Sequence, residues 1–414
     1  MQEHAKKPAI RFKGFTNDWE QRKLGESILI ERGGSPRPID DYITTAENGL
    51  NWIKIGDAPS QGRYITKTVE KIKPEGLSKT RQVVPGDLIL SNSMSFGKPY
   101  IMAIEGCIHD GWLLLRDNYN IFDLKFLCHM LGTSQMIQQY KKLASGSTVN
   151  NLNKELVGSA VVVMPSKQEQ NLIGEYIEIF DRLITLHQRK YDKLVNIKKA
   201  MLEKMFPKEG AKVPEIRFKG FTNDWEQRKL GEIAERVVRK NSELQSTLPL
   251  TISAQYGLVD QITYFNNRVA SNNIRGYYLI KNGEFAYNKS SSDGYPFGAV
   301  KRLDYYPMGV LSTLYIVFSI TSDVSSQFLV SYYDTNNWHK EVAERAAEGA
   351  RNHGLLNISA EDFFDTELKI PRGVREQEKI GELLKTLDRL ITLHQRKLEK
   401  LQNLKQACLA KLFV

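Results

Sequence analysis

The run PAIRFKGFTNDWEQRKLGE, from Pro8 to Glu26, decides the architecture because it returns as PEIRFKGFTNDWEQRKLGE from Pro214 to Glu232. The two runs are identical at 18 of 19 positions and lie 206 residues apart. A second run, DRLITLHQRK, occurs at residues 181–190 and again at 388–397, with an offset of 207 residues. Repeats at nearly one offset indicate that the chain is a tandem duplication of about half its length.

Length and charge limit the classes of protein to consider. At 414 residues, the chain is long enough for two or three globular domains. The 58 Lys and Arg residues outnumber the 48 Asp and Glu residues, which gives a formal charge of +10 and favours a polyanionic partner. The three cysteines show neither CxxC spacing nor a His/Cys cluster. We therefore expect that the chain holds no metal and that it occurs in a reducing cytoplasm. We also expect neither export nor a membrane span, because no apolar stretch is long enough.

Between the repeated runs, the two halves diverge. The inserts, Ser27 to Met164 and Ile233 to Ile370, share only scattered positions. Both contain short β-rich stretches, such as residues 87–90, 161–163 and 311–318, among Gly, Ser, Asn and Pro turns. Each insert is therefore predicted to be a mixed α/β domain.

A long helix is predicted after each insert, because apolar residues recur at steps of four and three. The first series is Ile173, Ile177, Phe180, Ile184, His187, Tyr191, Leu194, Met201 and Met205. The second is Ile380, Leu384, Leu387, Ile391, His394, Leu398, Leu401, Cys408 and Leu412. Two such seams can bury each other, and duplicated units that pack through the same surface run antiparallel. About 39 residues per helix correspond to a length of about 58 Å.

The predicted fold class is therefore α+β, with two globular mixed α/β domains separated by two long antiparallel coiled-coil helices, related by a pseudo-twofold internal duplication. The predicted segments are 1–165, 166–212, 213–371 and 372–414. Ser166 and Glu169 match a capping box at the start of the first helix. Trp19 and Trp225 lie in the repeated frame, where a packing role is expected.

Polar residues interrupt both seams at matching positions: Lys198 and Lys405, and His187 and His394. One interpretation places these side chains at the edge of the seam, with the lysine stems along the apolar surface. The alternative is that they fix the helix register, as single polar seam residues do. The basic run that follows residue 186 either faces solvent or contacts phosphates or an acidic partner.

Motifs for chemistry on nucleic acids are missing from the sequence. It has no G-x-x-x-x-G-K-[ST] phosphate loop, no Asn-Pro-Pro-Tyr or Asp-Pro-Pro-Tyr run, and no Gly-rich turn that opens a cofactor fold. We therefore expect no catalytic centre and no cofactor in this chain.

The repeated frame resembles that of type I restriction-modification specificity subunits. The resemblance rests on the opening pattern Pro-x-x-Arg-Phe-x-Gly-Phe with the following Trp-Glu and Lys-Leu-Gly-Glu. It also rests on each junction, where Pro, Glu-Gln and Ile-Gly-Glu precede the long helix, at Pro165, Glu169, Gln170 and Ile173, and at Pro371, Glu376, Gln377 and Ile380.

This resemblance implies that the inserts are target recognition domains, each reading one half of a split, asymmetric DNA sequence. The helices would then act as a ruler for the unread gap. It further implies two modification subunits, which hold S-adenosylmethionine and methylate adenine, and restriction subunits, which use ATP and Mg²⁺. These cofactors belong to the partners.

Polar loops that follow short strands in both inserts are the predicted DNA contacts, because paired donors and acceptors read bases in the major groove. In the first insert they are Ser91, Asn92, Ser93, Lys98, Ser147, Asn150 and Asn151. In the second they are Asn288, Lys289, Ser290, Ser291, Arg351, Asn352 and His353. For any one of these residues, ordinary surface turn chemistry is the alternative.

Two rival functions remain open on sequence grounds. One is a scaffold whose helix pair holds two interaction domains without DNA, and salt-sensitive duplex binding would separate it from a DNA reader. The other is a self-contained nuclease or methyltransferase, which would turn over labelled S-adenosylmethionine or DNA without partners.

Overall fold

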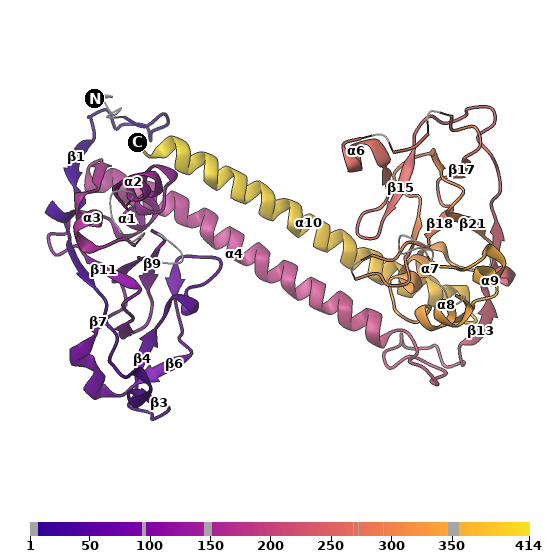
Figure 1. The fold of residues 1–414 in the computed structure, drawn as a ribbon, viewed down its shortest axis with the longest axis horizontal. Helices are drawn as coiled ribbons and strands as arrows, with labels where there is room; N and C mark the ends of the chain where they lie inside the picture. Colours follow the sequence, from indigo (N-terminus) through magenta and orange to yellow (C-terminus); the bar gives the residue numbers. More distant parts are fainter. Residues whose placement is uncertain are drawn as a thin grey trace. The chain divides into compact units, whose positions relative to one another are not determined.

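The computed structural model describes residues 7–92, 97–144, 151–267, 269–271, 273–292, 294–346 and 356–414. The chain divides into two compact units, of which the first comprises residues 1–190 and 394–414 and the second comprises 191–393. Two long helices, α4 (Lys167–Lys204) and α10 (Val374–Leu412), contribute to both units (Figure 1). Each unit thus contains one insert with one part of each helix, whereas the sequence-based segments kept the helices separate.

The two helices contain 38 and 39 residues, which confirms the predicted length. In the first unit, the early part of α4 contacts the late part of α10, where Asp181 pairs with Lys405 and His187 contacts His394. In the second unit, the late part of α4 contacts the early part of α10, and the Lys198 ammonium lies 2.7 Å from the Asp388 carboxylate. In both units the helix segments therefore run antiparallel, as predicted.

These contacts distinguish between the two interpretations of the seam lysines. The side chains of Lys198 and Lys405 are only 19% and 14% exposed, and both form ion pairs with the opposite helix. Asp181 and Asp388 are counterparts in the duplication, as are the two lysines, so the same pair of positions meets in each unit. Ion pairs at defined positions favour the interpretation that the lysines fix the helix register.

In its described residues, the first insert contains two five-stranded sheets and three α-helices. The first sheet has the order β3 (Ile43–Thr44), β6 (Glu70–Ile72), β4 (Leu50–Ile53), β10 (Gly106–Ile108) and β7 (Arg81–Val83). The second has the order β2 (Leu29–Arg32), β11 (Trp112–Arg116), β8 (Leu88–Ser91), β9 (Pro99–Met102) and β5 (Tyr64–Ile65). The helices are α1 (Leu124–Leu131), α2 (Ser134–Ala144) and α3 (Lys154–Ser159).

The second insert repeats the order of the second sheet in β14 (Ala234–Arg236), β21 (Ile316–Ile320), β18 (Phe285–Asn288) and β19 (Ala299–Arg302). Two strand pairs accompany it, β15 (Leu250–Ser253) with β16 (Gly257–Asp260), and β17 (Tyr278–Lys281) with β20 (Met308–Leu311). Its helices are α6 (Gln261–Phe265), α7 (Ser326–Tyr333), α8 (His339–Arg345) and α9 (Ala360–Phe364), and α5 (Leu230–Ile233) lies at the end of the repeated run before it. The predicted β-rich stretch 311–318 covers the end of β20 and the beginning of β21, which a turn at Ser312–Tyr315 separates.

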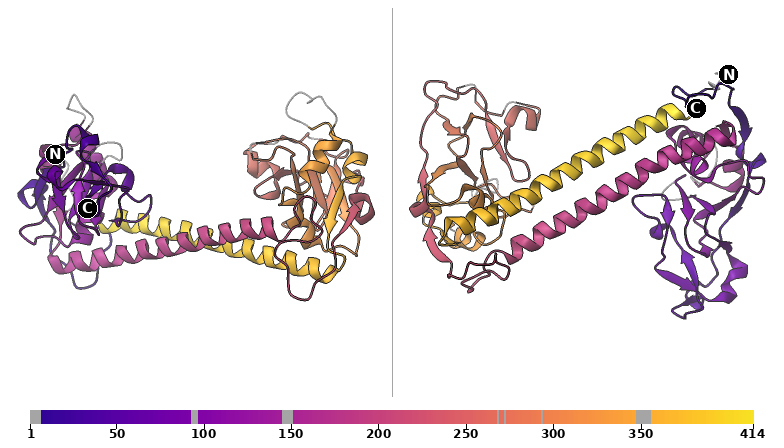
Figure 2. Two further views of the ribbon diagram at one scale, coloured as in Figure 1. Left: turned by 90° about the horizontal axis from the view of Figure 1, so that it is seen from below. Right: turned by 180° about the vertical axis from the view of Figure 1, so that it is seen from behind.

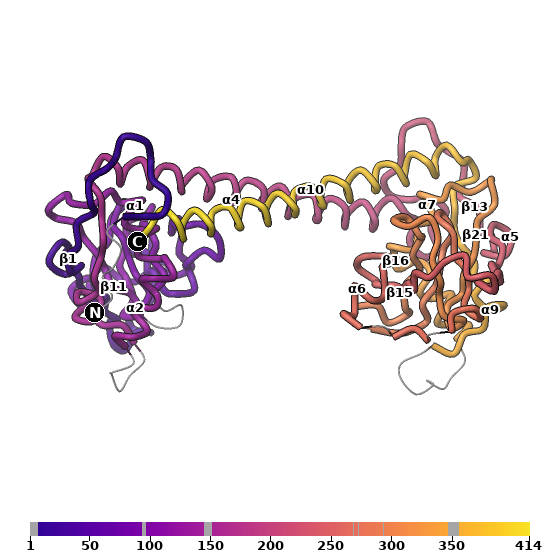
Figure 3. The backbone as a smooth tube through the Cα atoms, turned by 90° about the horizontal axis from the view of Figure 1, so that it is seen from above, coloured from indigo at the N-terminus to yellow at the C-terminus, as the bar shows by residue number. Residues whose placement is uncertain are grey.

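The repeated run joins each insert to the long helices. Its strand β1 (Glu20–Lys23) pairs antiparallel with β12 (Val161–Met164), and its counterpart β13 (Glu226–Lys229) pairs with β22 (Glu367–Ile370). The backbone N–H of Ile10 donates to the carbonyl of Lys411 at 3.0 Å, where the N-terminal segment passes the end of α10 (Figure 3). In the second unit, Ile216 donates in the same way to Lys204 at 2.9 Å. The frame is thus built twice with the same bonds.

A buried ion pair anchors each junction. The guanidinium of Arg11 donates two hydrogen bonds to the Glu169 carboxylate, at 2.7 and 2.8 Å, and Arg217 donates two to Glu376, at 2.6 and 2.8 Å. Both carboxylates are almost fully buried. The Glu169 oxygens, which the sequence suggested for a capping box with Ser166, therefore face Arg11.

At each junction, the glutamine of the Glu-Gln pair and the glycine of the Ile-Gly-Glu motif hold the long helix against the start of a shorter helix of the insert. The Gln170 side chain accepts from the backbone N–H of Asp123 at 2.9 Å, and Gln377 accepts from Ser325 at 2.8 Å. A Cβ atom at Gly174 would lie 2.5 Å from Asp123, so only glycine permits this close approach. These contacts give a physical reason for the Glu-Gln and Ile-Gly-Glu motifs.

Each unit has its own buried core. Trp19 packs edge-on against Phe126 of α1 in the first, and Trp225 packs against Phe328 of α7 in the second, which confirms the packing role predicted for both tryptophans. In the second unit, Phe318 of the sheet and Ile380 of α10 belong to the same buried cluster as Phe328. Figure 2 shows the orange backbone of this insert beside the beginning of α10. The sheet, α7 and the first turns of α10 therefore share one core. Among the described helices, none combines the length and the apolar character needed to cross a bilayer.

Candidate nucleic-acid interface

In the first unit, the described ends of two predicted loops meet. We call residues 91–98 and 146–151 the first loop pair. The backbone N–H of Leu152 donates to the carbonyl of Asn92 at 3.0 Å, which ties the end of one loop to the beginning of the other. Gly97 closes the first loop with φ +71°, and a Cβ atom there would lie 2.7 Å from the Tyr140 ring. A tertiary contact thus joins Asn92 and Leu152, which lie at the ends of two predicted loops that are distant in sequence.

The second unit repeats this arrangement with different side chains. We call residues 288–295 and 349–354 the second loop pair. The backbone N–H of Leu356 donates to the carbonyl of Lys289 at 3.0 Å, and the Lys289 ammonium donates to the carbonyl of Ile358 at 3.0 Å. The bond between Leu356 and Lys289 corresponds to the bond between Leu152 and Asn92. In each insert, described residues that flank or begin the predicted loops are therefore joined at corresponding places.

The described residues of the first loop pair differ in exposure. Ser91 and Asn92 are buried; the Ser91 hydroxyl accepts from the backbone N–H of Lys98 at 3.0 Å, and the Asn92 amide donates to the carbonyl of Asp110 at 2.8 Å. Lys98 is half-buried, with its ammonium 5.3 Å from the centre of the Tyr100 ring, and Asn151 is exposed. Ser91 and Asn92 thus hold the loop from beneath. Ser93, Ser147 and Asn150 lie outside the described residues.

In the second loop pair, Ser291 is exposed, whereas Asn288, Lys289 and Ser290 are half-buried. The Asn288 side chain accepts from the backbone N–H of Ser290 at 3.1 Å, which shapes the turn after β18. The predicted residues Arg351, Asn352 and His353 lie outside the described residues. DNA contact by all fourteen residues stays a prediction.

A polar groove beside the second loop pair was not predicted from the sequence. It lies in the second unit, between the late part of α4 and the insert, and has a volume of about 800 Å³. Its charged lining comprises Lys198, Lys199, Lys208, Lys301, Glu203 and Asp334, of which Lys198 and Lys301 pair with Asp334, and its polar lining includes Asn336, Asn337, His339 and Tyr295. Lys199 and Lys208 are exposed and belong to the basic run noted in the sequence. A concave surface with more lysines than acids, lined in part by Tyr295 of the second loop pair, suits a nucleic-acid backbone.

One group of side chains in the first unit has the composition of a metal site. Ligand atoms of His129, Glu178 and Asp181 lie within 4.8 Å of one another among the described residues. Asp181 already pairs with Lys405. Burial, followed by the charges of Arg63, Lys405 and Lys125, holds the pKa of His129 well below its usual value. These three cations disfavour a metal ion at this place.

A second surface, on α4, is apolar. Five residues of the first unit, each 37% to 46% exposed, follow the heptad spacing: Leu172, Tyr176, Ile179, Leu183 and Leu186. We call them the outer stripe. Each lies one position before a seam residue, so the sequence contained the signal as doubled apolar positions. Five consecutive exposed heptad positions are typical of a helix that packs against a further helix.

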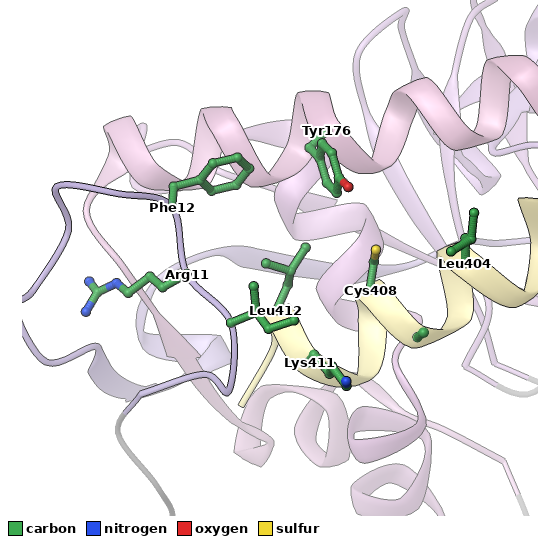
Figure 4. Close-up of a pocket in the computed structure, with 9 residues that line it drawn as sticks. Arg11, Phe12, Tyr176, Leu404, Cys408, Lys411 and Leu412 are labelled. Atoms are coloured by element: carbon green, nitrogen blue, oxygen red, sulfur yellow. The ribbon is translucent and has the colours of Figure 1, made fainter.

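An apolar pocket of about 350 Å³ adjoins the outer stripe at Tyr176 (Figure 4). The repeated run contributes Phe12 and the stem of Arg11, and α10 contributes Leu404, Cys408 and Leu412. The Phe12 and Tyr176 rings meet edge-on, with centroids 5.8 Å apart. The frame thus presents an apolar surface as well as an apolar hollow.

Comparison with known proteins identifies the class of protein. A family model described as the type I restriction modification DNA specificity domain matches residues 16–196 and again residues 222–403. The two matches cover most of the chain, so the chain belongs to this family. The resemblance predicted from the repeated frame and the α+β fold class are thereby confirmed.

Particular relatives agree with this membership. The chain is similar to the putative type I restriction enzyme MjaX specificity subunit of Methanocaldococcus jannaschii, at 26% identity over 233 residues. It is also similar to the type I restriction enzyme MjaVIII specificity subunit of the same organism, at 21% identity over 229 residues. The alignments cover 52% and 53% of this chain and 52% and 49% of those proteins, so the chain spans about half the length of the curated relatives it matches.

A solved structure has the same fold. The crystal structure of a type I restriction-modification system S subunit from M. genitalium aligns over 99% of both chains, with a TM-score of 0.64 and 15% identity. At this identity the likeness supports the arrangement of two mixed domains with long helices, and it does not identify binding residues.

Proposed function

We propose that this chain reads a split, asymmetric DNA sequence for a type I restriction-modification complex, with one half-site read by each insert. The observation that carries the proposal is the recurrence of one backbone hydrogen bond, Leu152 to Asn92 and Leu356 to Lys289, beside the predicted loops of two inserts with different sequences. A common scaffold with different loop side chains is suited to reading two different half-sites.

Base reading and positioning would fall to different residues. Arg351 and Asn352 have the paired donors and acceptors that recognise guanine and adenine in the major groove. Lys199 and Lys208, on the rim of the basic groove, are suited to phosphates, which fix position without reading sequence. The buried Ser91 and Asn92 would act by shaping the loop.

An exchange of inserts tests this function. Residues 27–164 are replaced by the corresponding insert of another family member, and methylated sites are sequenced in cells that hold the complete system. We expect one half-site to change while the other keeps its bases. If both half-sites changed together, or neither did, modular reading would be wrong.

We further propose that adenine methylation and DNA cleavage belong to partner subunits. Two modification subunits with S-adenosylmethionine would dock on this chain, and restriction subunits with ATP and Mg²⁺ would add to them. The outer stripe supports docking of a modification subunit, because its heptad spacing continues the seam and fits an amphipathic helix.

Two matched single variants test the docking surface. Ile179→Lys places a charge in the outer stripe, while Glu175→Lys places one at an exposed polar position on the same helix. We expect Ile179→Lys to weaken binding of the purified modification subunit by about tenfold or more and Glu175→Lys to leave it nearly unchanged. Equal affinities for the two variants would remove the outer stripe from the interface.

A further inference from the structure

The two seam histidines meet in the first unit. His187 of α4 and His394 of α10 place their Nδ1 atoms 2.8 Å apart, with ring centroids 5.0 Å apart and ring planes inclined by 45°. Both side chains are half-buried, so solvent reaches the pair. The run DRLITLHQRK occurs once in α4 and once in α10, and the two helices run antiparallel here. The histidine of one copy therefore contacts the corresponding histidine of the other.

We propose that this histidine pair binds a divalent transition-metal ion, with Cu²⁺ and Ni²⁺ preferred, and thereby links the two helices. Imidazole nitrogens are common ligands for these ions. A metal ion bound to both Nδ1 atoms takes the place of the hydrogen bond between them, with the rings turned so that both lone pairs face the ion and the hydrogen carried by Nε2. Water fills the remaining coordination positions, since the pair supplies two ligands.

The protonation state of the pair suits metal binding. At 2.8 Å, one Nδ1 must donate its hydrogen while the other accepts, so at least one ring is neutral. Burial lowers the pKa of both histidines; the positive charge of Lys190 and Lys397 lowers each further, and His394 adds to the effect on His187. Neutral imidazole is the form that binds metals, and the donor ring can move its hydrogen to Nε2 without releasing a proton.

The distance between the nitrogens selects the kind of ion. With metal–nitrogen bonds of about 2.0–2.1 Å, a separation of 2.8 Å corresponds to an angle of about 86° at the metal. That angle fits the 90° of the tetragonal and square-planar geometry that Cu²⁺ and Ni²⁺ adopt. A tetrahedral Zn²⁺ ion would require the nitrogens to be about 3.3 Å apart, so the helices would have to separate slightly.

The charged groups that act on both rings are Lys190 and Lys397, one from each helix. Both lysines are exposed, so salt screens their repulsion of a metal ion. The Gln61 side chain, from the first insert, donates to Gln188 beside the pair at 3.2 Å. Because the repulsion from the two lysines is screened, we expect the histidine pair to bind the metal ion with moderate affinity, and we expect this affinity to increase with ionic strength.

Copper binding to the full chain tests the proposal. All variants carry His4→Asn, so that the N-terminal histidine does not compete. The chain is titrated with CuCl₂ and NiCl₂ at pH 7.5 by calorimetry, and the copper-loaded chain is examined by electron paramagnetic resonance. We expect one site with signals from two nitrogens, and binding weakened about tenfold or more by His187→Asn or His394→Asn.

The matched control is His339→Asn, which removes a half-buried histidine of the second unit. This variant should keep the site, and circular dichroism should show native helix content in every variant. Zn²⁺ should bind more weakly than Cu²⁺ and Ni²⁺. The proposal is overturned if the His187→Asn and His394→Asn variants, folded as judged by circular dichroism, bind Cu²⁺ as His339→Asn does.

Discussion

Asp181→Asn should destabilise the chain more than Asp388→Asn, although the two residues are counterparts in the duplication. Lys405 and Asp181 are both 14% exposed and pair with each other. Lys198 is 19% exposed, but it contacts Asp388 at 2.7 Å and also Asp334 at 3.2 Å. Asp181→Asn therefore removes the ion pair of Lys405. After Asp388→Asn, by contrast, Lys198 still pairs with Asp334.

The pKa directions agree with this difference. Burial lowers the pKa of Lys405, and Asp181 offsets this only in part. Burial also acts on Lys198, but Asp334 and Asp388 together outweigh it and raise its pKa. Removal of one partner of a buried ion pair costs about 3–5 kcal/mol. Asp388 is 50% exposed, so solvent screens its contact with Lys198 and we expect a loss of about 1 kcal/mol there.

Urea unfolding, followed by circular dichroism and tryptophan fluorescence, measures both losses. The double variant Asp181→Leu/Lys405→Met should regain most of the stability that Asp181→Asn loses, because apolar residues can replace a buried ion pair at little cost. An equal loss in the two single variants, or a larger one for Asp388→Asn, would refute the reasoning.

Further predictions concern DNA and pH. One heptad inserted after Gln188 and one after Gln395 should lengthen the unread gap by about three base pairs while both half-sites keep their bases, as methylome sequencing would reveal. Arg351→Ala should cost about 1–3 kcal/mol of DNA binding at one half-site only, and unchanged methylation there would exclude this arginine. Lys199→Gln should weaken binding to all sequences and reduce the salt slope by about one, whereas an unchanged slope would exclude a phosphate contact. The folded chain holds the pKa of His129 below its unfolded value. The stability that neutral His129 contributes is therefore complete above pH about 6.5 and decreases below it. The His129→Leu variant should lose this part of the pH dependence of the unfolding free energy, measured across pH 5–8.

The helices could be predicted because heptad periodicity is a local property of the chain, but the partners of polar seam residues could not. Lys405 and Asp181 are separated by 224 residues, so their contact depends on the helix register. Lys198 gains a second partner, Asp334, that belongs to the divergent insert and has no counterpart in the frame. Repetition therefore predicted where the lysines lie, and packing decided which acids they meet.

The candidate interface was predictable to a similar degree. Loop positions follow from strand ends and turn residues, which are local signals. The burial of Ser91 and Asn92 was not visible in the sequence, because a polar residue at a strand end can face solvent or accept backbone hydrogen bonds. The basic groove was missed because its lining comes from α4, β19 and the segment around α8, which are distant in sequence.

By itself, the sequence determined the duplication, the α+β class, the two helices and the family, because each is encoded in residue order and spacing. Only the tertiary structure decided which elements meet: Arg11 with Glu169, His187 with His394, and the two loops of each pair. The physical reason is that such contacts depend on how close two segments lie in space. The number of residues between the segments does not determine that distance.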